Sequence, residues 1–147
     1  MRRYSASGNS AAGTNVTILE VVASTSTRGR IYDIMIGSDQ APADIATKFR
    51  LIRGTVAGAG TAFTPTALDP ADPAGLLTAQ QGTFTAQTKT ANSQMLEIAL
   101  NQRASYRFVS VPDSEIVIPA TASNWVGLES IASGATPTIS TTFLYQE

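Results

Sequence analysis

The fold is decided by two stretches, RIYDIMIG at residues 30–37 and KFRLIRGTV at residues 48–56, which SDQAPADIAT joins. In both stretches, β-branched and aromatic residues recur at every second position, which is typical of strands in a pleated sheet. In the first, Tyr32, Ile34 and Ile36 are expected to share one face of the strand, opposite Ile31. The joining segment is rich in Gly, Ser, Asp and Pro, which favour turns. We therefore expect two strands connected by a long loop.

The same period-two pattern recurs on both sides of this pair. Further stretches that carry it lie at residues 16–23, 83–90, 94–101, 103–111, 115–119, 124–131 and 136–147, and a turn is expected at Ser133-Gly134 between the last two. Short strands at roughly 8 to 12 residue spacing indicate a sandwich or barrel. Helical periodicity never persists, so the chain is expected to be all-β. The expected fold is a jelly-roll or Greek-key β-sandwich of about eight to nine strands.

Two segments depart from the strand pattern. Residues 1–15 are small and polar apart from Met1 and Tyr4, and we interpret them as an N-terminal arm, followed by a single β-sandwich domain at residues 16–147. Residues 57–82 contain three prolines and no sustained alternation, which predicts one long loop excursion and not a central strand. Within this excursion, Asp72 and Pro73 are suited to begin a short helix that has Leu76 and Leu77 inside it and ends at Gly82.

Composition limits the partners that this protein can bind. Lys and Arg number 10 and Asp and Glu number 11, so the net charge of -1 provides no field that would attract nucleic acid or an anionic membrane. Charged residues make up only 14% of the chain, well below the usual share of about a quarter. Because such a surface has little charge repulsion, we expect other protein subunits to cover much of it. No run approaches the ~20 apolar residues of a membrane span, and no export signal is visible.

Cys and His are both absent from the sequence. This excludes disulfides, thiolate nucleophiles and catalytic arrangements such as Ser-His-Asp, and it removes the usual ligands of transition metals. Carboxylate pairs among Glu97, Glu115 and Glu129 could still catalyse glycoside hydrolysis. However, Glu97 is expected to be solvated, and Trp125 is the only tryptophan available to stack on a sugar. Asp residues before Pro in LDPADPAG are interpreted as turn formers and not as calcium ligands. We expect no enzyme, no metal site and no cofactor.

Basic residues lie in the arm and along the central strands. On the strands, the simplest interpretation is a solvated face with cross-strand ion pairs to residues such as Asp33 or Asp44. The alternative is a face that binds an acidic protein surface. In the polar stretch 83–90, Lys89 is expected to protect a sheet edge from strand addition.

Three segments carry a family resemblance: KFRLIRGTVAGAGTAFTPTALDPADPAG at residues 48–75, LNQRASYRFVSVPDSEIVIPATASNWVGL at 100–128, and TTFLYQE at 141–147. From about Arg30 onwards, the chain resembles the jelly-roll decoration, or cement, proteins of tailed-bacteriophage capsids. The resemblance implies a structural virion protein, made in the host cytoplasm and bound to the outer surface of the head. It also implies a homotrimer that bridges major capsid protein subunits, with no nucleic acid, membrane or cofactor as partner.

The resemblance further implies that arms and loops make the contacts with the capsid. The arm at residues 1–13 and the loops at 39–46 and 57–82 occupy the positions that such contacts need. The candidate interface residues are Arg2, Arg3, Tyr4, Asp39, Asp44, Asp69 and Asp72. Arg and Tyr are among the residue types enriched at protein interfaces.

Two other function classes stay open. A receptor- or glycan-binding β-sandwich module of a phage fibre would have the same architecture, and a concave site exposing both Trp125 and Tyr106 would favour it. A small hydrolase would require a deep pocket that holds two carboxylates about 5 to 9 Å apart.

Overall fold

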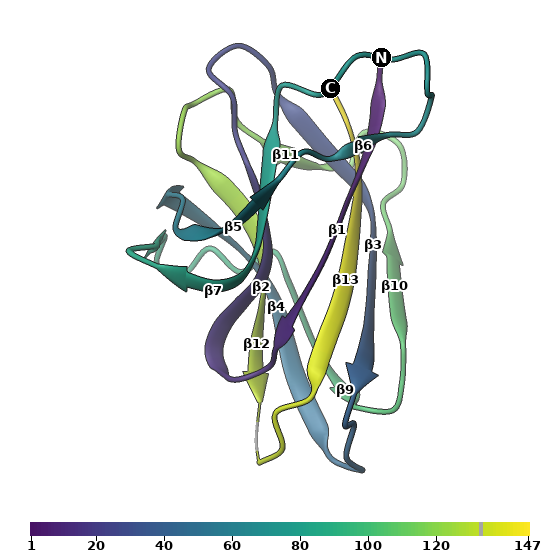
Figure 1. The fold of residues 1–147 in the computed structure, drawn as a ribbon, viewed down its shortest axis with the longest axis vertical. Helices are drawn as coiled ribbons and strands as arrows, with labels where there is room; N and C mark the ends of the chain where they lie inside the picture. Colours follow the sequence, from purple (N-terminus) through teal and green to yellow (C-terminus); the bar gives the residue numbers. More distant parts are fainter. Residues whose placement is uncertain (133) are drawn as a thin grey trace.

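Thirteen strands and no helix are present in residues 1–132 and 134–147, which are the residues that the computed structural model describes. The strands form two antiparallel sheets packed face to face, so the expected all-β sandwich is confirmed (Figure 1). The described part of the chain contains no helix of the length and hydropathy that crossing a membrane requires. The turn expected at Ser133-Gly134 falls partly outside the described residues.

Sheet A contains, in order, β10 (Tyr106–Val109), β3 (Gly29–Gln40), β13 (Thr138–Gln146), β1 (Arg3–Ala11) and β6 (Thr66–Ala67), and β11 (Ile116–Ile118) also pairs with β3. Sheet B contains, in order, β5 (Ala59–Phe63), β7 (Thr78–Thr85), β2 (Thr14–Val22), β12 (Trp125–Ala132), β4 (Ala46–Val56) and β8 (Thr88–Lys89), and β9 (Leu96–Asn101) also pairs with β4. Each stretch with the period-two pattern overlaps at least one of these strands. The expected number was too low because it omitted β1, β5 and β6 and counted the end of β7 and β8, at residues 83–90, as one strand.

The core lies between the inner faces of the two sheets. It is built from alternate residues of the long strands, such as Ile34 and Ile36 of β3 and Phe49 and Leu51 of β4. The face predicted for β3 is wrong in one place, because a register shift opposite Leu144 and Tyr145 makes the strand bulge. Ile31 is therefore fully buried, while Tyr32 is only half-buried. A second, smaller apolar cluster of Val22, Ile52 and Trp125 lies apart from this core.

The predicted N-terminal arm is wrong. Residues 3–11 form strand β1, which pairs with β13 along its length and with β6 near its start. Tyr4 and Ala6 are fully buried in the core. These residues cannot form a packed element alone, but β13 supplies the missing backbone partners and the sandwich buries their alternate side chains.

The long excursion is partly strand. Residues 57–82 contain β5, β6 and the start of β7, and none of these lies in the centre of a sheet, as the prolines predict. β6 pairs with β1 in sheet A, whereas β7 pairs with β2 in sheet B. The excursion therefore covers one edge of each sheet. The helix predicted at Asp72 and Pro73 is wrong, because this part of the chain runs as an irregular loop.

Candidate functional site

The predicted interface residues divide between the two ends of the sandwich. Five of them lie at the end that carries both chain termini in Figure 1: Arg2, Arg3, Tyr4, Asp69 and Asp72. Asp39 and Asp44 lie at the opposite end, because β3 runs from Arg30, near the termini, to Gln40. The tertiary structure therefore brings five of the seven together. We call the end formed by residues 1–4, 68–77 and 147 the terminal face.

The loop at residues 68–77 is fixed to the strand ends on several sides. The Leu68 amide donates to the Arg3 carbonyl at 2.9 Å, and the Tyr4 hydroxyl donates to the Pro73 carbonyl at 3.2 Å. The side-chain carboxylate of Glu147 accepts hydrogen bonds from the Leu76 and Leu77 amides, both at 2.9 Å. The loop is therefore held in one conformation before any partner binds, which lowers the entropic cost of binding.

Tyr4 lies in the core beneath the terminal face and is not an exposed anchor, contrary to its predicted role. Its ring is fully buried and stacks on Tyr145, with ring centroids 5.7 Å apart. Burial and the nearby Glu147 carboxylate raise the pKa of the Tyr4 hydroxyl, so it stays neutral and can donate to Pro73. The alternation of Tyr4 with Ala6 was the sequence signal for this inward position.

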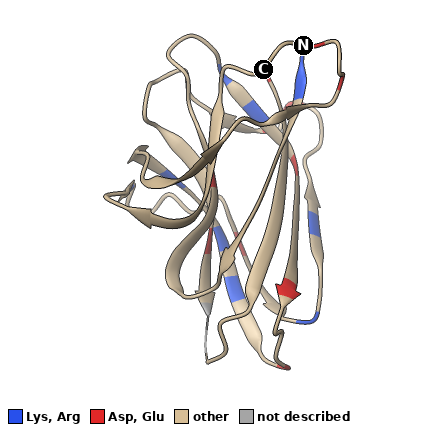
Figure 2. Ribbon diagram, in the orientation of Figure 1, with Lys and Arg blue, Asp and Glu red and all other residues tan. Residues whose placement is uncertain are grey.

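Several charged side chains of the terminal face contact other groups of the same chain. Arg2 pairs with Asp72 at 3.6 Å, the Asp69 carboxylate accepts from the Ala71 amide at 2.9 Å, and Arg3 lies over the Tyr32 ring. Charged residues are also sparse over the rest of the fold (Figure 2). The side chains exposed at this end are apolar instead. Met1 is 90% exposed, Leu68 48% and Leu76 57%.

Sequence reasoning missed these three apolar residues. Leu76 and its neighbour Leu77 were expected inside a helix, but Leu77 is buried in the core and Leu76 points to solvent. No periodicity marks either position, because the loop between Leu68 and Leu77 is irregular. The three exposed side chains make the terminal face suitable for binding an apolar protein surface.

Two hydroxyl-group substitutions test how the terminal face is supported. Tyr4→Phe is expected to lower the free energy of unfolding by about 1 kcal/mol, because the Pro73 carbonyl loses its donor. Tyr145→Phe is expected to leave it unchanged or raise it, because the buried Tyr145 hydroxyl has no hydrogen-bond partner among the described residues. Urea unfolding followed by circular dichroism measures both. A greater loss for Tyr145→Phe than for Tyr4→Phe would contradict this assignment.

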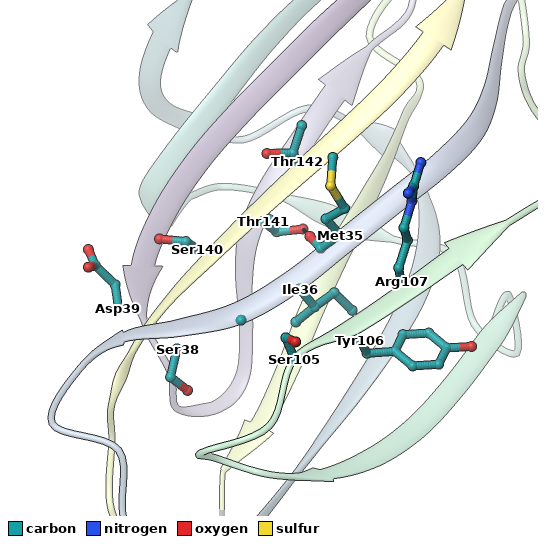
Figure 3. A pocket seen from close by; sticks show the side chains of 11 residues that line it. Met35, Ile36, Ser38, Asp39, Ser105, Tyr106, Arg107, Ser140, Thr141 and Thr142 are labelled. Atoms are coloured by element: carbon teal, nitrogen blue, oxygen red, sulfur yellow. Dashed lines mark hydrogen bonds between the residues drawn. The ribbon is translucent and has the colours of Figure 1, made fainter.

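A hollow with a volume of about 740 Å³ lies at the other end, on the outer face of sheet A (Figure 3). Asp39 lies on one side of it, and the Tyr106 ring points away from Asp39. Trp125 is buried on sheet B, so the site exposing both Trp125 and Tyr106, which would favour a glycan-binding module, is not formed. Asp44 accepts a hydrogen bond from the Asn101 side chain at 2.6 Å and contributes nothing to this hollow.

The carboxylates considered for catalysis are each paired with a cation. Glu97 pairs with Lys48 at 2.9 Å, Glu115 with Arg30 at 3.8 Å, and Glu129 with both Arg50 and Lys89. Lys89 does lie on an edge strand, β8, as predicted, but its side chain pairs with Glu129 instead of guarding that edge. Within residues 1–132 and 134–147, no three carboxylates lie close enough together to hold a metal ion.

The predicted ion-pair interpretation holds for Asp33, which is buried and accepts hydrogen bonds from Arg107 at 2.5 to 3.1 Å. This pair joins neighbouring strands, β3 and β10, of sheet A.

Among known proteins, no family model matches the chain, and a search of curated proteins also gives no match.

Proposed function

We propose that this protein is a non-enzymatic structural component of a phage virion, a decoration protein that binds the outside of the head and bridges major capsid protein subunits. The observation that carries the proposal is the terminal face, where a fixed loop and the start of the chain present Met1, Leu68 and Leu76, and where Arg2 pairs with Asp72. A partner that meets this surface buries apolar area.

Strand order supports the jelly-roll part of the proposal. The long strands follow the orders β1-β13-β3-β10 and β2-β12-β4-β9, and the chain crosses between the sheets at each step from β1 to β4. It then continues through β9, β10, β12 and β13, which completes two four-stranded sheets with the connectivity of two Greek keys. This is the architecture that the resemblance to decoration proteins implies.

The proposed assembly is a homotrimer. Three copies of one modest apolar surface engage the shell together, so their individual affinities combine through multivalency. A trimer of this chain has three times its mass of 15.4 kDa, which light scattering on the purified protein measures.

Leu76→Asp is expected to weaken binding to undecorated heads at least tenfold, because it places a charge where the partner surface is apolar. Co-sedimentation with heads assembled from the accompanying major capsid protein measures the affinity. Met35→Asp is the control, since the Met35 side chain is also exposed but lines a hollow at the opposite end of the sandwich. Equal affinities for the two variants would reject the terminal face as the docking surface. Failure of the unsubstituted protein to bind heads would reject the proposed function itself.

A further inference from the structure

A short segment crosses the outer face of sheet B. Residues 85–90, which we call the strap, run from the end of β7, beside β2, across the sheet and include β8. β8 pairs with β4 on the side opposite β12. The strap is attached by the backbone pairing of β8 with β4, by the Thr90 amide, which donates to the Arg53 carbonyl at 2.9 Å, and by two side chains. Gln87 accepts a hydrogen bond from the Thr17 hydroxyl at 2.8 Å and donates to Glu20 at 2.5 Å. Lys89 donates to the Asn15 carbonyl at 2.7 Å and pairs with Glu129.

The strap covers part of the second apolar cluster. The Thr88 carbonyl and the Trp125 indole both lie against Gly54 of β4, so tightly that a Cβ at Gly54 would collide with each. Trp125 belongs to the cluster with Val22 and Ile52 on this side of the sheet. Lifting the strap would therefore open the surroundings of Trp125 to water.

Two features make the closed strap unfavourable in itself. Ala86 has a φ of 57°, in the left-handed region that residues other than glycine rarely adopt. Glu20, to which Gln87 binds, is fully buried, and its Oε1 atom has no hydrogen-bond partner within the described part of the chain. A buried carboxylate with one unpaired oxygen costs more free energy than a buried neutral carboxyl group. The closed strap thus depends on the protonation of Glu20.

Burial raises the pKa of Glu20 from 4.5 to about 7, against the opposing effects of the hydrogen bonds from Gln87 and the Gly58 amide. The other charged groups on this face are Glu129 of β12, Arg50 and Lys48 of β4, Glu97 of β9 and Lys89 of the strap. Glu129 pairs with Arg50 and Lys89, and Lys48 pairs with Glu97. A lifted strap lets water reach Glu20 and returns its pKa towards 4.5. Strap closure is therefore strongest below about pH 4.5, weakens as the pH rises to about 7, and stays at its weakest above that.

We propose that the strap is a proton-controlled cover, which lies closed over sheet B while Glu20 is protonated and lifts when Glu20 ionises. The inference is independent of the proposed virion function, because it rests only on contacts within one chain. The Glu20–Gln87 hydrogen bond holds the strap closed, and opening exposes the cluster around Trp125.

Trp125 makes this device directly measurable, because it is the only tryptophan and lies against the strap. Between pH 4.5 and 8, its fluorescence emission is expected to move to longer wavelength while the far-ultraviolet circular dichroism stays constant. Glu20→Gln keeps the acceptor for Gln87 but cannot ionise, and is expected to abolish the shift. Glu97→Gln removes an exposed carboxylate of the same sheet and is expected to leave the shift unchanged.

Hydrogen exchange provides a second measurement that does not depend on any variant folding. After correction for the intrinsic pH dependence of exchange, the strap amides of the unsubstituted protein are expected to exchange at least tenfold faster at pH 8 than at pH 4.5. A constant exchange rate and constant Trp125 emission across this range would overturn the proposal. An equal emission shift in Glu20→Gln would also overturn it.

Discussion

Gly54→Ala is expected to lower the free energy of unfolding by about 3 kcal/mol, at the upper end of what overpacking usually costs. The added Cβ would overlap the Trp125 indole and the Thr88 carbonyl. Neither can easily yield, since the indole nitrogen donates to the Val56 carbonyl at 2.9 Å and the Thr88 carbonyl is backbone. Urea unfolding followed by circular dichroism measures the loss.

Gly37→Ala is the matched control for this substitution. Gly37 also lies within a long strand, β3, but the nearest atom to an added Cβ is the Ser105 Cβ at 4.0 Å. Because alanine loses less backbone entropy on folding than glycine, this variant is expected to be unchanged or more stable by up to about 1 kcal/mol. Similar losses in the two variants would show that the space around Gly54 is not what requires glycine there.

Glu129→Ala is expected to lower the free energy of unfolding by about 3 kcal/mol, the usual cost of removing one partner from a buried ion pair. The Glu129 side chain is fully buried in sheet B and pairs with both Arg50 and Lys89. Its removal leaves two partly buried cations without their anion. Arg50 would retain only its hydrogen bond to the Asn15 side chain, at 3.0 Å, among the contacts of the described residues.

The matched control is Glu97→Ala. Glu97 lies on β9, which flanks β4 on the side opposite β12. Glu97 pairs with Lys48 across neighbouring strands, but both side chains are nearly half exposed. Solvent screens such a pair, so its loss is expected to change the free energy of unfolding by no more than about 0.5 kcal/mol. Thermal or urea unfolding of both variants gives the comparison. A loss for Glu97→Ala as large as that for Glu129→Ala would contradict the assigned role of burial.

Several side chains were misjudged because their environment is created by distant segments. Lys89 follows a polar stretch that resembles an exposed edge, yet it reaches a buried carboxylate 40 positions further along the chain. Tyr4 lies in a small, polar stretch, yet β13 and the 68–77 loop enclose it. Leu76 and Leu77 are adjacent and chemically identical, and only the path of the loop decides which one is exposed.

The fold class was determined by the sequence alone, because the period-two alternation of apolar residues is a local property that a pleated strand imposes on each stretch. The absence of Cys and His likewise followed from the sequence and limited the possible chemistry. Only the tertiary structure decided that residues 3–11 are a strand, that the terminal face gathers Arg2, Asp69 and Asp72, and that the strap covers Glu20. These features depend on contacts between residues about 65 to 145 positions apart, and no local pattern records which distant segment supplies the partner.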